Sequence, residues 1–466
     1  MAAGKDAVDI GDLAAAVTAV ALDTETRERY AHDDAEWADY MPPLAVVFAA
    51  SVDDVVATVR FAADHGLAVI PRGAGTGLSG GANATVGSIV LSLERMTAIR
   101  SVDVEERLAV VEAGVLNDDL RRHVAEQGLW YPPDPASMAI STIGGNVATN
   151  AGGICCVKYG VTRDYVLGMT VVLADGSVAH LGRQTAKGVT GYDLTALMVG
   201  SEGTLGIVVE VTVKLLPLAG RSERAIVGYF RSLTDAGRAV AAVSAEGIVP
   251  AALELIDRTC LHAVAQWQDW DLPEGAAALL LAKVDEPGGT GAELADRIAA
   301  HFAAAGGAAV EQSDDPGEIL RLFTARRLAY PALERLGPVL TEDICVPRRR
   351  VPEMLSRIER IAAAHDVVIA NIAHAGDGNL HPLIIAPVGD DAAKARAKAA
   401  FDEIVDGCRE LGGTVTGEHG VGLLKLPGAA AELSPRVVAM HRAVKNALDP
   451  AGILNPGKAF PTGDAS

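Results

Sequence analysis

Two short segments rich in histidine and glycine place the strongest constraint on how this chain can fold. The first, HAGDGNLH, runs from His374 to His381, and the second, GEHG, runs from Gly417 to Gly420. The chain has only 11 histidines, and three of them lie in these segments. Two imidazoles and one carboxylate can form a three-ligand metal site with an open position. If they do so here, the fold must bring together two segments that are about forty residues apart.

The donor types in these segments suit a catalytic metal site. We expect His374, His381 and Glu418 to bind zinc or another divalent metal ion. His419, beside the carboxylate, would then be free to act as a base. The alternative is a pair of glycine-rich turns that carry incidental polar residues.

Length and charge limit the classes of function. A chain of 466 residues is too long for one ordinary core and predicts two or three domains. The formal net charge of −20 argues against a nucleic-acid partner and against simple electrostatic adhesion to anionic lipid. An anionic substrate would need a local basic site in this negative field.

The cysteines and the apolar runs indicate a cytoplasmic protein. Five scattered cysteines with no C-x-x-C give little support to a disulfide framework, a zinc finger or an iron–sulfur cluster. The adjacent Cys155 and Cys156 are either redox-active or packed small residues, and adjacent-cysteine geometry favours packing. We see neither a signal peptide nor a run long enough to span a membrane. We expect the chain to be free in the cytoplasm or peripheral at the inner face of the membrane.

The first part of the chain has the pattern of an α/β unit. A strand at Ala45–Phe48 precedes a helix that is capped by Ser51 and ends at Gly66, and Leu67–Ile70 is the next strand. The segment Pro71–Gly81 follows, with five glycines in eleven residues, and its amides can converge on an anion. A short helix is also expected at Asp9–Leu22.

The segment Ser141–Gly153 consists almost entirely of small residues. It suits either close approach to a large flat ligand or tight helix–turn packing. After about Gly220 the chain has more alanines and longer helices, which predicts a second, α+β domain. There we expect Pro287–Gly291 to be a surface loop and Glu293–Ala305 a helix.

Six motifs in order give the chain a resemblance to a known family. It resembles the FAD-dependent D-2-hydroxyacid dehydrogenases of the vanillyl-alcohol-oxidase superfamily, which include D-lactate dehydrogenases, the glycolate oxidase catalytic subunit and D-2-hydroxyglutarate dehydrogenase. The resemblance runs from about Pro42 to the C-terminus. The motifs are PRGAGTGLSGG at Pro71, TIGGNVATNAGG at Thr142, GSEGTLGI at Gly200, HAGDGNLHP at His374, GEHGVG at Gly417 and LNPGK at Leu454.

The resemblance implies an α+β fold with a vanillyl-alcohol-oxidase-type FAD-binding domain of two α/β subdomains. It also implies an α+β cap domain with an antiparallel sheet and a C-terminal helical segment that returns to the flavin. We place an N-terminal helical segment at 1–41, the FAD-binding domain at 42–219, the substrate or cap domain at 220–415 and the C-terminal segment at 416–466.

The resemblance also assigns residues to the cofactor. The first loop contains no histidine, so we expect FAD to be bound non-covalently. The residues implied to contact FAD are Pro71, Arg72, Gly73, Ala74, Gly75, Thr76, Gly77, Ser79, Gly80, Pro133, Asp134, Thr142, Gly144, Gly145, Asn146, Asn150, Gly153, Glu202, Gly203, Ile207, Val208 and Asn455.

In the same way, His374, His381 and Glu418 match the metal ligands of the family and His419 matches its catalytic base. Arg326 matches the arginine that binds the substrate carboxylate. Arg348 is a weaker candidate for that role, and a surface position explains it equally well.

Three positions bear on the choice of substrate. The hydroxyglutarate enzymes read a distal carboxylate with a threonine, a lysine and an asparagine, and this chain has Tyr330, Thr341 and Leu383 at those positions. A buried second carboxylate without a cation would be costly. We therefore expect a monocarboxylate such as D-lactate, glycolate or a longer apolar D-2-hydroxyacid.

The expected activity is FAD- and metal-dependent oxidation of a D-2-hydroxyacid to the 2-oxoacid. The electron acceptor would be a quinone, a cytochrome, an electron-transfer flavoprotein or an iron–sulfur subunit, and a homodimer is a candidate assembly. Three alternatives stay open: the catalytic subunit of a glycolate oxidase complex, a D-2-hydroxyglutarate dehydrogenase, and a flavoprotein with ether-lipid synthase chemistry.

Overall fold

The computed structural model describes residues 9–35, 37–218, 222–268, 270–387 and 389–461. The chain begins with a four-stranded sheet of order β1-β2-β4-β3, in which β2, β3 and β4 are parallel. Its apolar strands are buried, and α3 covers one side. These elements are β1 (Val20–Ala21), β2 (Ala45–Phe48), β3 (Ala68–Arg72), β4 (Ser88–Ser92), α1 (Gly11–Ala16), α2 (Thr24–Arg29) and α3 (Val52–His65).

The N-terminal segment predicted to be helical at 1–41 contains α1, β1 and α2 in its described residues, so the predicted extent of its first helix is wrong. The helix expected at Asp9–Leu22 ends at Ala16, and β1 then pairs antiparallel with β2. The side chain of Asp54 accepts hydrogen bonds from the amide and hydroxyl of Thr18, which holds the chain extended there. The caps expected for α3 are confirmed: the Ser51 side chain accepts from the Asp54 amide, and Gly66 is left-handed.

A five-stranded antiparallel sheet of order β5-β6-β10-β8-β9 follows. The short helix α5 (Ile143–Thr149), made by the small-residue segment, packs against β6 and β10. The other elements of this part are β5 (Ile99–Asp103), β6 (Leu108–Glu112), α4 (Asn117–Ala125), β7 (Leu129–Trp130), α6 (Cys156–Tyr159), η1 (Thr162–Tyr165), β8 (Val166–Val172), β9 (Val178–Gly182), α7 (Leu194–Met198), β10 (Ile207–Lys214) and β11 (Leu216–Pro217).

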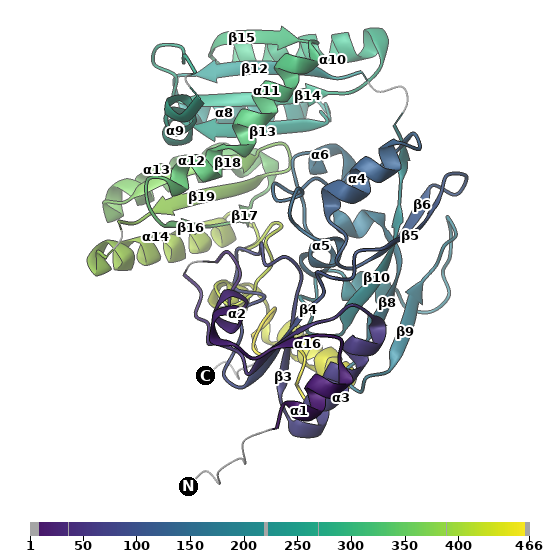
Figure 1. Ribbon diagram of the computed structural model, residues 1–466. Coiled ribbons are helices and arrows are strands. Elements are labelled where there is room, and N and C mark those ends of the chain that lie inside the picture. Colours follow the sequence, from purple (N-terminus) through teal and green to yellow (C-terminus); the bar gives the residue numbers. More distant parts are fainter. Residues whose placement is uncertain (1–8, 36, 219–221, 269, 388, 462–466) are drawn as a thin grey trace.

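The second half of the chain builds one antiparallel sheet of order β15-β12-β14-β13-β18-β19-β16, with β17 also paired to β19. Helices α8, α10, α13 and α14 bury their apolar residues on one face, and α9, α11 and α12 on the other. Figure 1 shows β12, β13, β14 and β15 at the top of the molecule, and β16 and β19 to the left of the second sheet. Its strands are β12 (Arg224–Phe230), β13 (Ala252–Asp257), β14 (Ala278–Val284), β15 (Gly307–Ser313), β16 (Val339–Thr341), β17 (Ile344–Cys345), β18 (Val368–His374) and β19 (Asn379–Ile385).

One boundary in this half differs from the prediction. Gly288 and the residues after it, expected in a surface loop, form the first turn of α10 behind Pro287. Gly288 has φ +61°, which glycine adopts without strain, so the chain can turn from the extended Pro287 into the helix. The helices are α8 (Leu233–Ala245), α9 (Arg258–Gln268), α10 (Gly288–Ala304), α11 (Pro316–Arg327), α12 (Ala329–Glu334), η2 (Arg348–Arg350), α13 (Val351–His365) and α14 (Asp391–Glu410).

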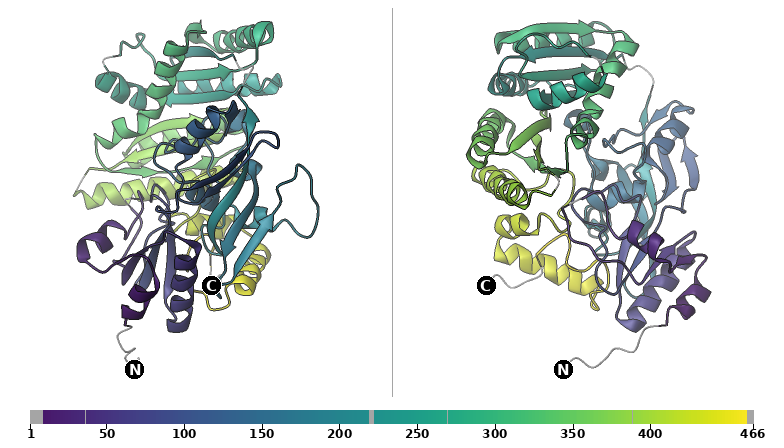
Figure 2. Two further views of the ribbon diagram at one scale, coloured as in Figure 1. Left: turned by 45° about the vertical axis from the view of Figure 1, so that its right-hand side comes forward. Right: turned by 60° about the vertical axis from the view of Figure 1, so that its left-hand side comes forward.

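The C-terminal part crosses back to the first sheet. After α15 (Leu426–Glu432) and α16 (Pro435–Leu448), Leu454 forms a bridge with Val69 of β3. Figure 2 shows this part beside the first two sheets and away from the outer strands of the third. In the described residues, no helix is long and apolar enough to cross a membrane. The boundary proposed near residue 220 falls on residues outside the described ranges.

Candidate active site

The β18–β19 hairpin places both histidines of the first segment on one face of the third sheet. The register pairs Ile372 with His381 and His374 with Asn379. Side chains alternate along a strand, so His374 shares a face with Ile372 and therefore with His381. Both imidazoles are buried, and their rings meet edge to face at 5.2 Å between centroids.

The turn of this hairpin requires glycine at one position. Gly378 has φ +87°, and a Cβ there would overlap the carbonyl oxygen of Val346. Because Val346 lies directly after β17, the tight turn holds the hairpin against that strand.

Glu418 completes a three-ligand cluster with these histidines. Its Oε1 lies 3.1 Å from His374 Nε2 and 3.3 Å from His381 Nε2. Ligands about 2.1 Å from a tetrahedral zinc ion are separated by roughly 3.4 Å. The two nitrogens and the oxygen therefore fit a divalent metal ion with little movement.

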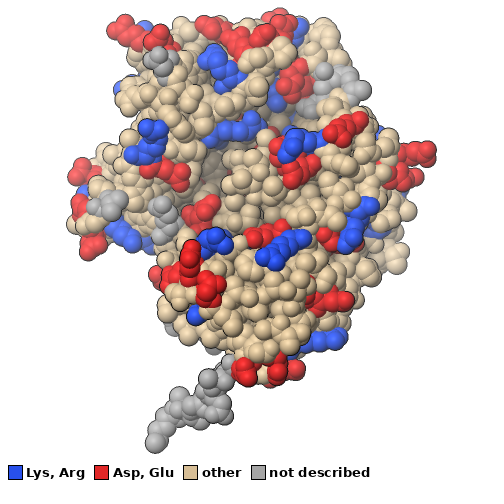
Figure 3. All heavy atoms as spheres, viewed as in Figure 1, with Lys and Arg blue, Asp and Glu red and all other residues tan. Residues whose placement is uncertain are grey.

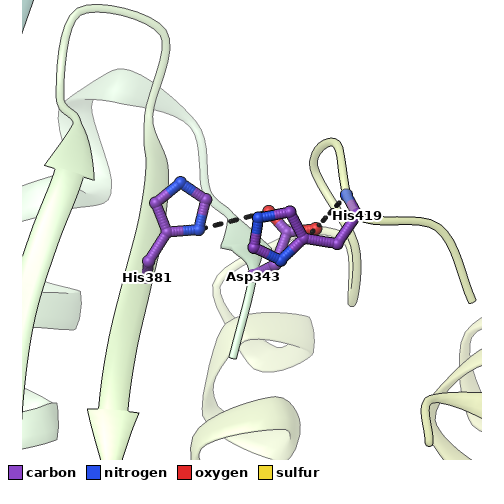
Figure 4. Close-up of side chains that lie close together, drawn as sticks. All are labelled: Asp343, His381 and His419. Atoms are coloured by element: carbon purple, nitrogen blue, oxygen red, sulfur yellow. Dashed lines mark hydrogen bonds and ion pairs between the residues drawn. The ribbon is translucent and has the colours of Figure 1, made fainter. Parts of the chain in front are cut away.

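A second group of possible ligands overlaps the first: Asp343, His381 and His419. Figure 4 shows these side chains, with His381 on its strand and His419 on a loop. The carboxylate of Asp343 is already engaged, because its Oδ1 accepts from Asn379 and its Oδ2 accepts from several donors of the GEHG loop. The other group, His374, His381 and Glu418, is therefore the one that could hold a divalent metal ion with its facing atoms engaged mainly with one another.

Asp343 anchors the loop that carries Glu418 and His419. Its Oδ2 accepts hydrogen bonds from the amides of Gly417, Glu418 and His419 at 2.9, 3.0 and 2.8 Å. The Lys425 ammonium lies 3.2 Å from the same oxygen, and both side chains are buried. Burial alone would raise the pKa of Asp343, but the charge of Lys425 and the neighbouring groups holds it well below its usual range. Asp343 therefore stays ionised and fixes the loop that carries His419.

Glu202 holds the other end of the same loop. Its carboxylate accepts from the amides of Val421 and Gly422 at 2.7 and 2.8 Å. The backbone oxygen of Glu202 accepts from Asn455, which also donates to Gly81. Glu202 and Asn455 were both predicted to contact FAD. Glu202 thus connects to the loop of His419, and Asn455 connects the C-terminal segment to Glu202 and to the glycine-rich segment Pro71–Gly81.

A large cleft runs past this loop. Its lining includes Glu418 and His419 together with most of the residues predicted to contact the cofactor. The predicted residues that line it are Pro71, Arg72, Gly73, Ala74, Gly75, Thr76, Gly77, Ser79, Thr142, Gly144, Gly145, Asn146, Glu202, Gly203, Ile207 and Val208. Those that do not line it are Gly80, Pro133, Asp134, Asn150, Gly153 and Asn455.

The cleft offers a buried cation to a dinucleotide. It encloses about 1400 Å³ of space between atoms, including part that is open to solvent. Arg72 lines it, is buried, and has an Nε without a hydrogen-bond partner among the described residues. A buried cation with an unsatisfied donor suits the pyrophosphate of FAD. Gly75, with φ +82°, leaves space for this guanidinium, because a Cβ there would overlap it.

The cleft is in direct contact with the three-residue cluster of His374, His381 and Glu418. A Cβ on Gly152 would overlap Glu418 Oε2, so only glycine allows the small-residue segment to lie against this ligand. Burial lowers the pKa of His419 to about 4, although the nearby Asp343 charge works in the opposite direction. The imidazole is therefore neutral near pH 7, the state in which it can accept a proton.

Of the two candidate arginines, only Arg326 reaches the cluster. Its Nε lies 2.8 Å from Glu254 Oε2, and both side chains are buried. Arg348 is exposed on η2. Among the described residues it makes no ion pair or hydrogen bond with His374, His381 or Glu418. Leu383 is fully buried and pairs across the strands with Thr341, while Tyr330 and Thr341 line a small separate hollow, and none of the three lines the cleft.

Three buried groups of the site were missed from the sequence: Glu254, Asp343 and Lys425. Glu254 is a charged residue inside the apolar strand ALELID, which was a usable signal. Asp343 and Lys425 stand in mixed segments, and nothing local distinguishes them from surface residues.

Known proteins share both halves of this arrangement. Residues 43–182 match a family described as an FAD binding domain, and residues 220–459 match the C-terminal domain of FAD linked oxidases. Glycolate oxidase subunit GlcD of Bacillus subtilis is 41% identical over 432 residues, covering 92% of each chain. D-lactate dehydrogenase of Anaerostipes hadrus is 35% identical over 450 residues, covering 94% of each chain.

Solved structures support the fold. The 4-ethylphenol oxidase of Gulosibacter chungangensis superposes with a TM-score of 0.80 at 21% identity, covering 97% of each chain. A p-cresol methylhydroxylase gives a TM-score of 0.80 at 19% identity, covering 98% of this chain and 97% of its own. The fold is therefore the α+β fold of vanillyl-alcohol-oxidase-type flavoproteins. With its cleft, its two matched domains and these relatives, the chain belongs to the FAD-linked D-2-hydroxyacid dehydrogenase family and is an FAD-linked oxidoreductase.

Proposed function

We propose that this protein oxidises a D-2-hydroxy monocarboxylic acid, such as D-lactate, to the 2-oxoacid, using non-covalent FAD and a divalent metal ion. One observation carries the proposal. Glu418 of the metal cluster and the adjacent His419 line the same cleft as the FAD-binding segments. A substrate held by the cluster would therefore lie within reach of the cofactor.

Each group at the site has a separate role in the proposed reaction. When bound, FAD supplies the hydride acceptor and the metal ion supplies a Lewis acid for the 2-hydroxyl. His419, neutral and held by Asp343, accepts the hydroxyl proton as general base. Arg326 binds the carboxylate, because it is a buried cation whose Nε makes no hydrogen bond among the described residues, and a guanidinium can bind a carboxylate through two donors.

The surroundings favour a monocarboxylate. Leu383 is part of an apolar core, and Tyr330 packs against that core. A second carboxylate at this end would lose its hydration without gaining a cation from Tyr330, Thr341 or Leu383. Turnover of D-2-hydroxyglutarate as efficient as that of D-lactate would contradict this part of the proposal.

Anaerobic mixing with D- and L-2-hydroxyacids, followed by flavin absorbance, tests the activity. We expect bleaching with D-lactate-like acids and its loss after chelation of the metal. His419→Gln should slow bleaching by about 10²–10⁴-fold. His365→Gln, at a surface histidine paired with Glu403, is the control and should leave it unchanged. A His419→Gln variant that bleaches at the wild-type rate would refute the assignment of the base.

A second candidate is the FAD-carrying subunit of a glycolate-oxidising complex. The names of the Bacillus subtilis relative and of a 38% identical relative from Escherichia coli, both glycolate oxidase subunit GlcD, favour it. All five cysteines are free, and neither candidate metal group in the described residues includes one, so electrons would leave to another protein or a quinone. Co-purification with an iron–sulfur subunit and a preference for glycolate would decide for this candidate.

We also propose that the functional units follow the boundaries 42–219, 220–415 and 416–466. The strands of the first two sheets lie before residue 220. The strands of the third sheet lie between residue 220 and the loop of His419. Limited proteolysis that cuts first near residue 220 would support this division.

A further inference from the structure

Glu254 makes two contacts that link separate parts of the site. The side chain is fully buried on β13. Both of its oxygens lie within hydrogen-bond distance of His374 Nδ1, at 2.9 and 3.0 Å. Its Oε2 is also 2.8 Å from Arg326 Nε. One carboxylate therefore touches a metal ligand and the arginine assigned to the substrate.

The sheet register makes this arrangement rigid. Leu255 pairs with Ala373 in adjacent antiparallel strands, so Glu254 and His374 are the next residues along that register. Arg326 comes from the last turn of α11, which buries its apolar residues on this sheet. The strand thus fixes Glu254 between a residue of the neighbouring strand and a residue of a covering helix.

The contact with His374 has a defined chemical effect. A histidine that binds a metal through Nε2 usually donates its Nδ1 hydrogen to a carboxylate or carbonyl, which fixes the tautomer and the ring orientation. Glu254 stands at that position for His374. The equivalent approach to His381 is weaker, because Asp343 Oδ1 lies 3.6 Å from His381 Nδ1 and forms no hydrogen bond with it.

The contact with Arg326 has a different effect. The guanidinium Nε lies 2.8 Å from Glu254 Oε2 in a buried ion pair, although its N–H is not aligned for a hydrogen bond. The attraction between these buried charges holds the arginine beside His374, so that it loses less rotamer freedom when it binds a substrate carboxylate.

We propose that Glu254 is a positioning residue that sets both the metal ligand His374 and the carboxylate anchor Arg326, so that one buried charge aligns the two ends of the substrate. This inference rests on the proposed function of the site. It predicts that a single substitution weakens metal binding and carboxylate binding together, although these are separate contacts.

The test measures the two binding constants in Glu254→Gln. The affinity of the metal-free protein for Zn²⁺ is measured by competition with a chromophoric chelator. Propionate, which has a carboxylate but no 2-hydroxyl, reports the Arg326 contact through its perturbation of the flavin spectrum at saturating Zn²⁺. We expect Zn²⁺ binding to weaken by about 10- to 100-fold and propionate binding by about 10-fold or more.

Two further variants make the test specific. Asp257→Asn alters another buried carboxylate on β13, which bonds to Cys260 and Asn371, and should change neither constant by more than about twofold. Glu254→Asp keeps the charge but is one methylene shorter, so it cannot span both partners. It should weaken at least one constant by about 10-fold, even where Glu254→Gln fails to fold.

The outcomes separate this inference from the proposed function. Loss of only one constant in Glu254→Gln, or no loss in either variant, would overturn the shared role while leaving the activity intact. A wild-type protein that binds no divalent metal ion would overturn the proposed function and this inference with it.

Discussion

Replacing Asp343 with asparagine is expected to loosen the loop that carries Glu418 and His419. The carboxylate accepts from three successive amides, from the Thr416 hydroxyl and from Lys425. Asparagine keeps the shape but removes the charge, and it leaves a buried ammonium without its partner. Removing one member of a buried ion pair costs about 3–5 kcal/mol.

That cost can be read at the loop itself by native-state hydrogen exchange. At 1.36 kcal/mol per tenfold change, the amides of Gly417, Glu418 and His419 should exchange roughly 150- to 5000-fold faster in Asp343→Asn. The amides of β12, in the same sheet but away from the loop, serve as the internal reference. Adding Lys425→Met should recover part of the protection, because it removes the unpaired charge. Loop amides that exchange within about threefold of the wild-type rate would refute the anchoring role.

Three other predictions concern the arginines, the glycine beside Glu418 and the buried Glu342. Arg326→Met should lower kcat/KM for D-lactate by about 100-fold or more, while Arg348→Met, at the exposed candidate, should change it by less than about twofold in the same assay. Gly152→Ala should displace Glu418 and weaken Zn²⁺ binding by at least about tenfold, whereas Gly289→Ala, where a Cβ meets nothing within 4 Å, should not alter it in the same titration. Burial raises the pKa of Glu342 to about 7. Its carboxyl is thus neutral in the folded protein but ionised in the unfolded chain between about pH 4.5 and 7, and it makes folding less favourable as pH rises through that window. Between about pH 4.5 and 7, the Glu342→Gln variant should therefore become more stable relative to the wild type as pH rises, by up to about 3 kcal/mol. A difference in thermal unfolding between the two proteins that does not change with pH would contradict this prediction.

The sequence was informative where the determinants are local. Ser51 and Gly66 mark the ends of α3 because capping depends on residues within one turn. The two histidine segments could be paired because their ligand chemistry is specific even without a fold. In contrast, β1 was missed, because its pairing with β2 depends on a segment about 25 residues away and on the hold of Asp54 on Thr18.

The roles of the buried carboxylates could not be predicted from the sequence. Glu254 acquires its role only beside His374, 120 residues later in the chain. Asp343 acquires its role only beside the loop amides, 74 to 76 residues later. No periodicity or spacing encodes such contacts, since they arise from the order in which the strands of one sheet lie side by side.

The charges around the cluster connect the metal with the choice of substrate. Glu254 forms an ion pair with Arg326 and Asp343 forms one with Lys425, while Glu418 faces His374 and His381. With both histidines neutral, as metal ligands are, three carboxylates outnumber two cations by one. On the face shown in Figure 3, acidic and basic side chains are interspersed and basic ones border the hollowed region, while the whole chain carries a net charge of −20. A hydroxyacid anion would thus approach the site against the negative charge of the whole chain, which is unfavourable. A divalent cation reverses the local excess to one positive charge, which a monocarboxylate neutralises and a dicarboxylate exceeds. The same balance therefore supports the requirement for a metal ion and the preference for an acid with a single carboxylate.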